Sequence, residues 1–291
     1  MRHKTITIIS ALLCVLQLSA FAQSPRGMRR GGPEQSGSTP VLKPNQPEAP
    51  AGFDTPRSGA ARGKVIPFEY ESKTAGGTFR ATIYAPPGFS PGKKYPVLFL
   101  LHGASGDENN WVQAIHADAI LDNLYADKRL VPMLVVMPSS ISVAGRQQAA
   151  ESRDAKARAS MTFGEVLLND LLPYVESKFP ALTGRENRAL AGLSMGAGAA
   201  LSTGTANSDK FAWVGAFSGA GRRWTEPNEK LRLLWLSVGD RDSMMGAGMV
   251  AADAFFTEKN IPHVFRINAG GHEPKVWMND LYHFAPLLFQ P

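Results

Sequence analysis

Apolar runs and polar segments alternate along the chain from about residue 65 onward, and their spacing predicts a sheet flanked by helices. Runs that are apolar throughout, such as Tyr95–Leu101, are typical of strands buried on both faces of a parallel sheet. Apolar residues at helical spacing predict helices over Ala119–Arg129 and Phe163–Phe179. Further strands are predicted at Val65–Tyr70, Phe79–Ala85, Met133–Met137, Arg188–Leu193, Ala212–Phe217, Leu233–Val238 and His263–Asn268. This alternation of strands and helices predicts an α/β fold: a single domain with a mainly parallel central sheet.

The beginning of the chain has a different pattern, which is typical of an export signal. Arg2 and Lys4 precede an apolar run over Ile6–Leu18, and the small residues Ala20 and Ala22 follow it. The run is short for a membrane span, so we expect a signal peptide over residues 1–22 rather than an anchor. The expected location is periplasmic or secreted, with no membrane association after cleavage.

Residues 23–64 are rich in Pro, Gly and Ser and poor in large apolar side chains, which predicts a disordered linker before a domain over residues 65–291. All of the formal net charge of +6 falls in the first 64 residues, whereas acidic and basic residues balance in the domain. The basic linker is expected to be a solvated spacer, and nothing indicates that the domain binds nucleic acid. Cys14, in the signal, is the only cysteine, which excludes disulfides, a thiol nucleophile and cysteine metal ligands after cleavage.

The strand Arg188–Leu193 leads into the pattern G-x-S-x-G, with Ser194 between Gly192 and Gly196. Small residues there can serve close packing alone. Between a strand and a helix, however, the pattern is typical of a nucleophile elbow, in which bulky residues beside the serine would clash. The context favours Ser194 as a nucleophile.

Two later strands are followed by residues that complete a catalytic triad. Asp240 and Asp242 follow Leu233–Val238, and His272 follows His263–Asn268. Each could be a turn or loop residue by itself. The order Ser, Asp, His, each after a strand, is the order of α/β-hydrolases, in which the histidine is the general base. The spacing leaves the choice between the two aspartates open.

An oxyanion hole in this fold combines the N–H after the nucleophile, here Met195, with one from the loop after the third strand. In that loop Ala104 is the candidate donor, and His102 is expected to brace the loop. The chain has no H-E-x-x-H or phosphate-binding loop pattern, so the sequence implies no metal and no cofactor.

The stretches "LLHGASGDENNW", "RALAGLSMGAGAA", "LLWLSVGDRDSMM" and "GGHEPKVWMNDLYHFAPLLF" resemble the esterase family that includes feruloyl and acetyl xylan esterases, carbohydrate esterase family 1. Its wider group holds mycolyltransferases and enterochelin esterases. The resemblance implies a serine carboxylic ester hydrolase, with Asp242 as the acid and Ala104 and Met195 as the oxyanion donors. The implied substrate is a feruloyl or acetyl ester of a plant cell-wall polysaccharide, such as xylan, or of its oligosaccharides. Siderophore-ester hydrolysis, acyl transfer and a non-catalytic glycan-binding module are the alternatives.

Three residues are candidates for substrate contacts: His102, Trp111 and Trp277. The two tryptophans could flank the cleft and stack on a sugar or an aromatic acid, although Trp277 shares a helical spacing with Leu281 that favours core packing. The basic segment 138–162 departs from the acidic or aromatic stretch of feruloyl esterases, and it could be a solvated helix or a lid. The acyl group and the oligomeric state stay open.

Overall fold

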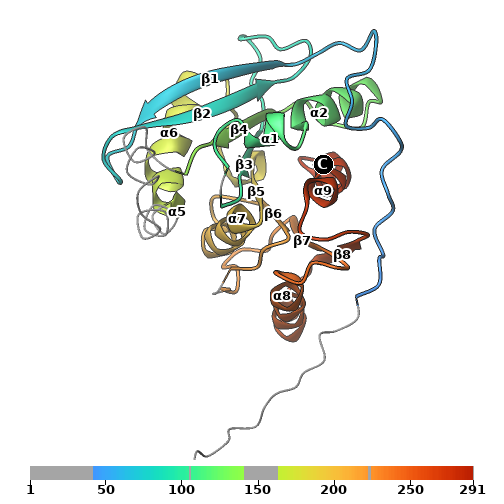
Figure 1. Cartoon of the computed structure of the whole chain (residues 1–291). Coiled ribbons are helices and arrows are strands. Elements are labelled where there is room, and N and C mark those ends of the chain that lie inside the picture. Colours follow the sequence, from blue (N-terminus) through green and yellow to red (C-terminus); the bar gives the residue numbers. More distant parts are fainter. Residues whose placement is uncertain (1–41, 105, 141–162, 222–223, 291) are drawn as a thin grey trace, which may run out of the picture. The chain divides into compact units, whose positions relative to one another are not determined.

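The computed structural model describes residues 42–104, 106–140, 163–221 and 224–290, which form a sheet covered by helices on both faces (Figure 1). The expected signal peptide, the expected linker up to residue 41 and the basic segment after residue 140 lie outside the described residues. No helix in the described part of the chain is long and apolar enough to cross a membrane.

The sheet of the described residues has eight strands in the order β1-β2-β4-β3-β5-β6-β7-β8. The strands β3 to β8 run parallel to one another. β2 pairs antiparallel with β4, and β1 pairs antiparallel with β2. The strands are β1 (Lys64–Glu71), β2 (Thr78–Ala85), β3 (Val97–Leu101), β4 (Leu134–Pro138), β5 (Arg188–Leu193), β6 (Trp213–Phe217), β7 (Leu233–Gly239) and β8 (Val264–Asn268). The prediction of a mainly parallel sheet is confirmed.

Helices cover the two faces of this sheet as separate groups. On one face lie α1 (Asn110–Gln113), α2 (Ala117–Ala126) and α9 (Pro274–Phe284). On the other lie α5 (Phe163–Val166), η1 (Leu167–Leu171), α6 (Leu172–Lys178), α7 (Met195–Ala206) and α8 (Gly246–Glu258). Short 3₁₀ turns, η2 (Arg185–Asn187) and η3 (Ala285–Leu287), complete the described elements.

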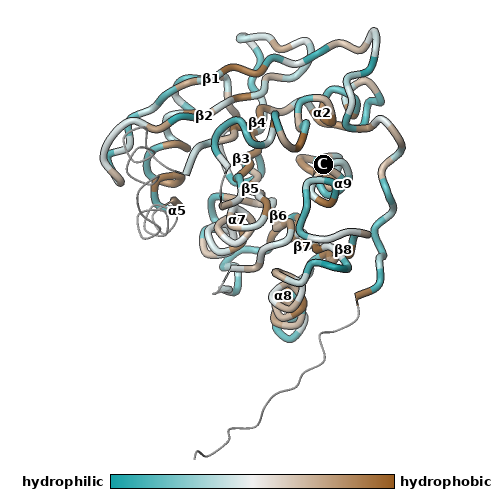
Figure 2. The backbone as a smooth tube through the Cα atoms, viewed as in Figure 1, coloured by the Kyte–Doolittle hydropathy of each residue, from teal (hydrophilic) through white to brown (hydrophobic). Residues whose placement is uncertain are grey.

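Alternate residues of the central strands supply the core on each face. In β3, Leu98 and Leu100 join the core under α2 and α9, whereas Phe99 and Leu101 join the core under α6. These strands are hydrophobic throughout because both of their faces are covered, and the hydrophobic segments lie around β3 and β5 to β7 (Figure 2).

The helix predicted over Phe163–Phe179 is present, but its middle, η1, is a π-helical turn. Pro173 is the second residue after this turn, and a proline cannot donate a backbone hydrogen bond. Prolines and single π-turns both distort the regular hydrogen bonding of a helix.

The prediction of a disordered linker up to residue 64 is wrong for its described part, residues 42–63, which we call the N-terminal strap. The strap pairs with β8, where the Asn45 and Gln46 N–H groups donate to the Ile267 carbonyl at 2.9 and 3.0 Å. Phe53 packs edge-on against Tyr282, with ring centroids 5.3 Å apart. Composition suggested disorder because the strap has few large apolar residues. Hydrogen bonds to the domain order it instead, and they leave no local pattern in the sequence.

Candidate active site

Ser194 lies on a sharp turn between β5 and α7, at the carboxyl end of the sheet where ligands bind in such folds. Its backbone has φ 52° and ψ −117°, a conformation that non-glycine residues rarely adopt and that costs about 1–3 kcal/mol. A Cβ on Gly192 would lie 2.6 Å from the Gly196 carbonyl, and one on Gly196 would lie 2.4 Å from the His102 carbonyl. Any side chain at position 192 or 196 would therefore clash with neighbouring backbone, which agrees with the expectation that both positions require glycine.

The structure brings Ser194, His272 and Asp242 together from the ends of β5, β8 and β7. His272 Nε2 lies 2.8 Å from Ser194 Oγ, and His272 Nδ1 lies 2.8 Å from Asp242 Oδ2. Nδ1–H donates to the carboxylate, which leaves Nε2 as the acceptor for the serine proton. The Asp242 side chain is fully buried and that of His272 is 15% exposed, so the chain of hydrogen bonds is shielded while the histidine stays accessible.

The two aspartates of the turn after β7 have different partners. Asp242 Oδ1 accepts from the N–H groups of Met244 and Met245, and its other oxygen is left for His272. Asp240 Oδ1 accepts from the Gly270 N–H at 2.8 Å, and its Oδ2 accepts from Arg241 Nη1 at 3.3 Å. The geometry agrees with Asp242 as the acid and gives Asp240 a place in the turn that leads to His272.

The two expected oxyanion donors belong to the helix that follows Ser194 and to the loop after β3. Met195 is the first residue of α7, and the first N–H groups of a helix have no carbonyl partner one turn back. Ala104 is exposed in the loop after β3. Gly103, before it, packs against the turn, since a Cβ there would lie 3.4 Å from Ser194 Cβ. The loop therefore lies beside the nucleophile, as an oxyanion hole requires.

His102 is buried and braces this loop. Its Nε2 accepts from the Ser140 N–H at 3.0 Å, and its Nδ1 lies 2.6 Å from the Gly103 carbonyl. These contacts require the tautomer with the proton on Nδ1 and join the ends of β3 and β4. Both ring nitrogens of His102 are therefore engaged within the protein. The ring also lines a pocket, and the interpretation of His102 as a substrate contact rests on that alone.

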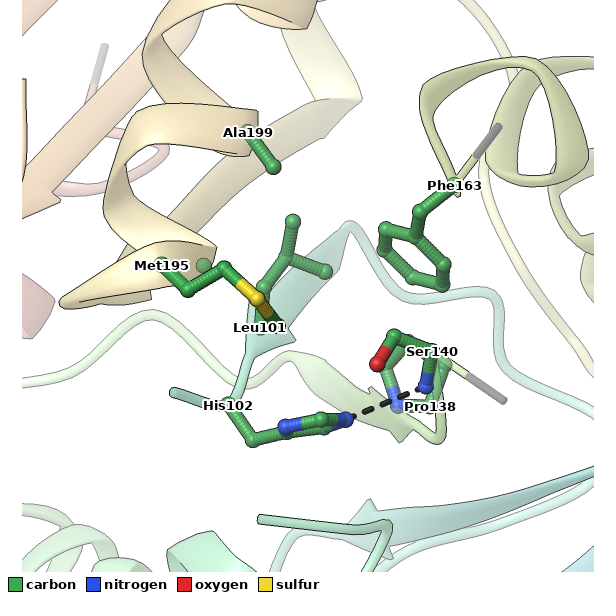
Figure 3. A pocket seen from close by; sticks show the side chains of 8 residues that line it. Leu101, His102, Pro138, Ser140, Phe163, Met195 and Ala199 are labelled. Carbon is green, nitrogen blue, oxygen red and sulfur yellow. Dashed lines mark hydrogen bonds between the residues drawn. The ribbon is translucent and has the colours of Figure 1, made fainter. Parts of the chain in front are cut away.

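A pocket opens next to the first turn of α7 (Figure 3). Four apolar side chains surround it and face one another in the close-up: Leu101, Phe163, Met195 and Ala199. His102, Pro138, Ser140 and Gly196 complete its lining. Sequence reasoning missed Leu101, Phe163 and Ala199, because each reads as an ordinary core position of a strand or helix.

The interpretation of Trp111 as a cleft residue is wrong. Its side chain is fully buried in the core under α1 and α2, where it packs edge-on against Phe217. A buried indole cannot stack on a sugar. Trp277, in α9, packs edge-on against the His272 ring at 5.0 Å and joins the core on its other side. Core packing, the interpretation favoured by its spacing, describes Trp277 better than substrate stacking.

The described residues contain no group of three or more His, Cys, Asp or Glu side chains that could hold a metal ion.

Comparison with known proteins now identifies the family. The family model described as "Putative esterase" matches residues 72–283, which is most of the chain. The chain belongs to this esterase family. Its fold is that of the α/β-hydrolases.

Three relatives illustrate the likeness. An endo-1,4-beta-xylanase/feruloyl esterase of Xylanibacter ruminicola is 27% identical over 78% of the chain, and the chain spans 32% of that protein's length. The structure of a ferulic acid esterase of Anaeromyces mucronatus, solved with ferulic acid, has a TM-score of 0.76 at 24% identity. The match covers 83% of this chain and 96% of the Anaeromyces mucronatus chain. The enterobactin esterase of Shigella flexneri has a TM-score of 0.61 at 22% identity. The match covers 81% of this chain and 60% of the Shigella flexneri chain. The two solved structures share the fold with this esterase.

Proposed function

We propose that this esterase hydrolyses carboxylic esters through an acyl-enzyme on Ser194. The observation that carries the proposal is the continuous chain of hydrogen bonds from Ser194 Oγ through His272 to the buried Asp242, with both distances at 2.8 Å. Such an arrangement activates a hydroxyl, which is otherwise a weak nucleophile at neutral pH.

In the first half-reaction, Ser194 Oγ attacks the ester carbonyl carbon while its proton moves to His272 Nε2. The carbonyl oxygen takes up the negative charge and accepts hydrogen bonds from the Met195 and Ala104 N–H groups. The tetrahedral species collapses, the bond to the alcohol oxygen breaks, and His272 gives its proton to that oxygen. Asp242 holds the imidazole in the required tautomer and stabilises its charged form.

In the second half-reaction, a water molecule replaces the alcohol. His272 takes a proton from the water, the resulting oxygen attacks the acyl carbon, and the bond to Ser194 Oγ breaks. The proton returns to the serine, and the free acid leaves. The balance of the reaction is one ester and one water converted into one acid and one alcohol.

The proposed substrate is a feruloyl or acetyl ester of a plant cell-wall polysaccharide of the xylan type, or of its oligosaccharides. Two observations support it: the name of the Xylanibacter ruminicola relative and the apolar pocket beside Met195, which suits an acyl chain or ring. The alcohol part then lies on the solvent side, where a long sugar chain can extend.

Fluorophosphonate labelling tests the catalytic proposal. The wild-type protein should be labelled on one serine, and Ser194→Ala should not be labelled and should not hydrolyse a nitrophenyl ester. Folded wild-type protein that is never labelled would favour a non-catalytic glycan-binding module. The acyl group is then tested by incubation with arabinoxylan, where release of ferulate supports a feruloyl esterase and release of acetate alone supports an acetyl xylan esterase.

Siderophore-ester hydrolysis is the second candidate, because the enterobactin esterase shares the fold over 81% of this chain. Turnover of a siderophore triester in preference to feruloylated oligosaccharide would support it.

We also propose that the esterase is exported, with a signal peptide over residues 1–22. Amino-terminal sequencing of protein recovered outside the cytoplasm should begin at Gln23. Protein that is retained in the cytoplasm with an intact first residue would contradict the proposal.

A further inference from the structure

The side of the molecule behind His272 contains a buried polar network that the proposed reaction does not use. Asn268, the last residue of β8, is 1% exposed, and Asn279 and Asp280 in α9 are 9% and 0% exposed. Asn268 Nδ2 donates to Asp280 Oδ1 at 2.8 Å, and Asn279 Nδ2 donates to Asn268 Oδ1 at 2.7 Å. Buried amides are costly unless both their donors and acceptors are paired, and here they pair with one another.

The same network holds the N-terminal strap. Asn279 Nδ2 also donates to the Pro47 carbonyl at 3.0 Å, and Asn279 Oδ1 accepts from the Ala49 N–H at 2.7 Å. One side chain therefore joins the strap, α9 and the end of β8. The strap also pairs with the outer edge of β8 through Asn45, whose Oδ1 accepts from the Ile267 N–H at 2.8 Å.

From Asn268, hydrogen bonds continue to both loops that carry the triad. The Asn268 carbonyl accepts from the Asp240 N–H at 2.8 Å, and the Arg241 N–H donates to the Gly270 carbonyl at 2.9 Å. Asp240 Oδ1 in turn accepts from the Gly270 N–H. The turn before Asp242 and the turn before His272 are thus tied to each other and, through Asn268, to α9 and the strap.

We propose that Asn279 is a positioning residue for the reaction: by anchoring both the strap and Asn268, it fixes the loops that place His272 against Ser194 and Asp242. This inference rests on the proposed function of the triad. Displacement of a catalytic group by about 1 Å can cost about 100-fold in rate, so a modest loosening of these loops is visible in turnover.

The chain supplies a matched control at the other end of the strap. Asn123, in α2, is 1% exposed, and its Nδ2 donates to the carbonyls of Phe53 and Thr55 at 2.8 and 2.9 Å. Asn123 therefore anchors the strap as Asn279 does, but the hydrogen bonds of its side chain go to the strap and not to Asn268.

The experiment compares Asn279→Ala with Asn123→Ala in the full chain. Both variants should lower Tm, because each removes hydrogen bonds to the strap. Asn123→Ala removes the donor to the Phe53 and Thr55 carbonyls. Asn279→Ala removes the acceptor of the Ala49 N–H and the donor to Asn268 Oδ1. Only Asn279→Ala should lower kcat for a nitrophenyl ester, by about tenfold or more relative to the wild type, when the number of active sites is titrated with a fluorophosphonate. The KM of both variants should stay within about twofold of the wild-type value. Equal kcat values in the two folded variants would overturn the proposal.

Hydrogen exchange provides a readout that does not depend on turnover. The amides of Asp240, Arg241 and Gly270 should exchange faster in Asn279→Ala than in Asn123→Ala, and unchanged exchange would overturn the proposal. Wild-type protein without esterase activity would refute the proposed function alone, since the exchange comparison still decides the positioning role. If Asn279→Ala does not fold, Asn279→Asp serves instead. It keeps the acceptor for Ala49 and places a second acceptor against Asn268 Oδ1, and the same shift in kcat and exchange is expected.

Discussion

Asp242 Oδ2 lies 2.8 Å from His272 Nδ1, and this contact separates Asp242 from the aspartate two residues before it. Asp240 accepts a backbone N–H from Gly270 and is part of the turn rather than of the triad. Two carboxylates on one short turn therefore have different tasks. The buried carboxylate holds the His272 ring, which we propose as the base, and the partly buried one holds the loop that carries His272.

The first prediction concerns these two carboxylates. Asp242→Asn should lower kcat by about 10³–10⁴-fold, because the amide cannot stabilise the required tautomer or the charged imidazole. Asp240→Asn should lower kcat only a few-fold, because the amide oxygen can still accept from Gly270. Steady-state kinetics on a nitrophenyl ester measures both. The reverse order of effects would assign the acid to Asp240.

A glycine behind the nucleophile provides the second prediction. A Cβ on Gly219 would lie 2.0 Å from the Ser194 carbonyl oxygen, a distance that requires the backbone of the turn to move. Gly219→Ala should therefore slow fluorophosphonate labelling of Ser194 by more than about tenfold and lower Tm. Gly92→Ala is the control, since the nearest atom to its Cβ is 3.9 Å away. Labelling at the wild-type rate in both variants would show that the turn tolerates the methyl group.

The N-terminal strap provides the third prediction. Phe53→Ala should lower the free energy of unfolding by about 1–3 kcal/mol, because the ring packs on Tyr282 and is partly buried. Arg57→Ala removes an exposed ion pair with Asp127, which solvent screens, and should have a much smaller effect than Phe53→Ala. Urea unfolding measures both changes. A disordered linker would give no loss for either variant, so equal and negligible effects would restore the expectation from composition.

The proximity of Ser194, Asp242 and His272, which we propose as a triad, could be predicted from sequence because it follows from chain order. Parallel strands place their carboxyl ends at one edge, so residues after β5, β7 and β8 must lie near one another. The choice of Asp242 over Asp240 needed the family resemblance, because both residues follow the same strand and only the direction of the side chain distinguishes them.

Trp111 and the strap were not predictable for a different reason. The helix around Trp111, α1, has only four residues, too few to show which face is buried. The strap is held by Asn279 and Asn123, whose partners are more than 65 residues away in the sequence. Contacts of this kind depend on the folded domain and leave no local periodicity.

The last prediction concerns Asp280, whose complete burial raises the pKa of its carboxyl to about 7, although the hydrogen bond from Asn268 acts in the opposite direction. The unfolded chain should titrate this group near 3.9. Between these two values the folded state binds more protons than the unfolded state. The stability that the protonated form contributes is therefore lost as pH rises toward 7, by ~4 kcal/mol at most.

Asp280→Asn keeps the acceptor for Asn268 and removes the titrating group. Urea unfolding at pH 5 and pH 8 should show a larger decrease for the wild type than for the variant, since all other groups titrate alike in both. Parallel decreases would show that Asp280 does not change its protonation in this range.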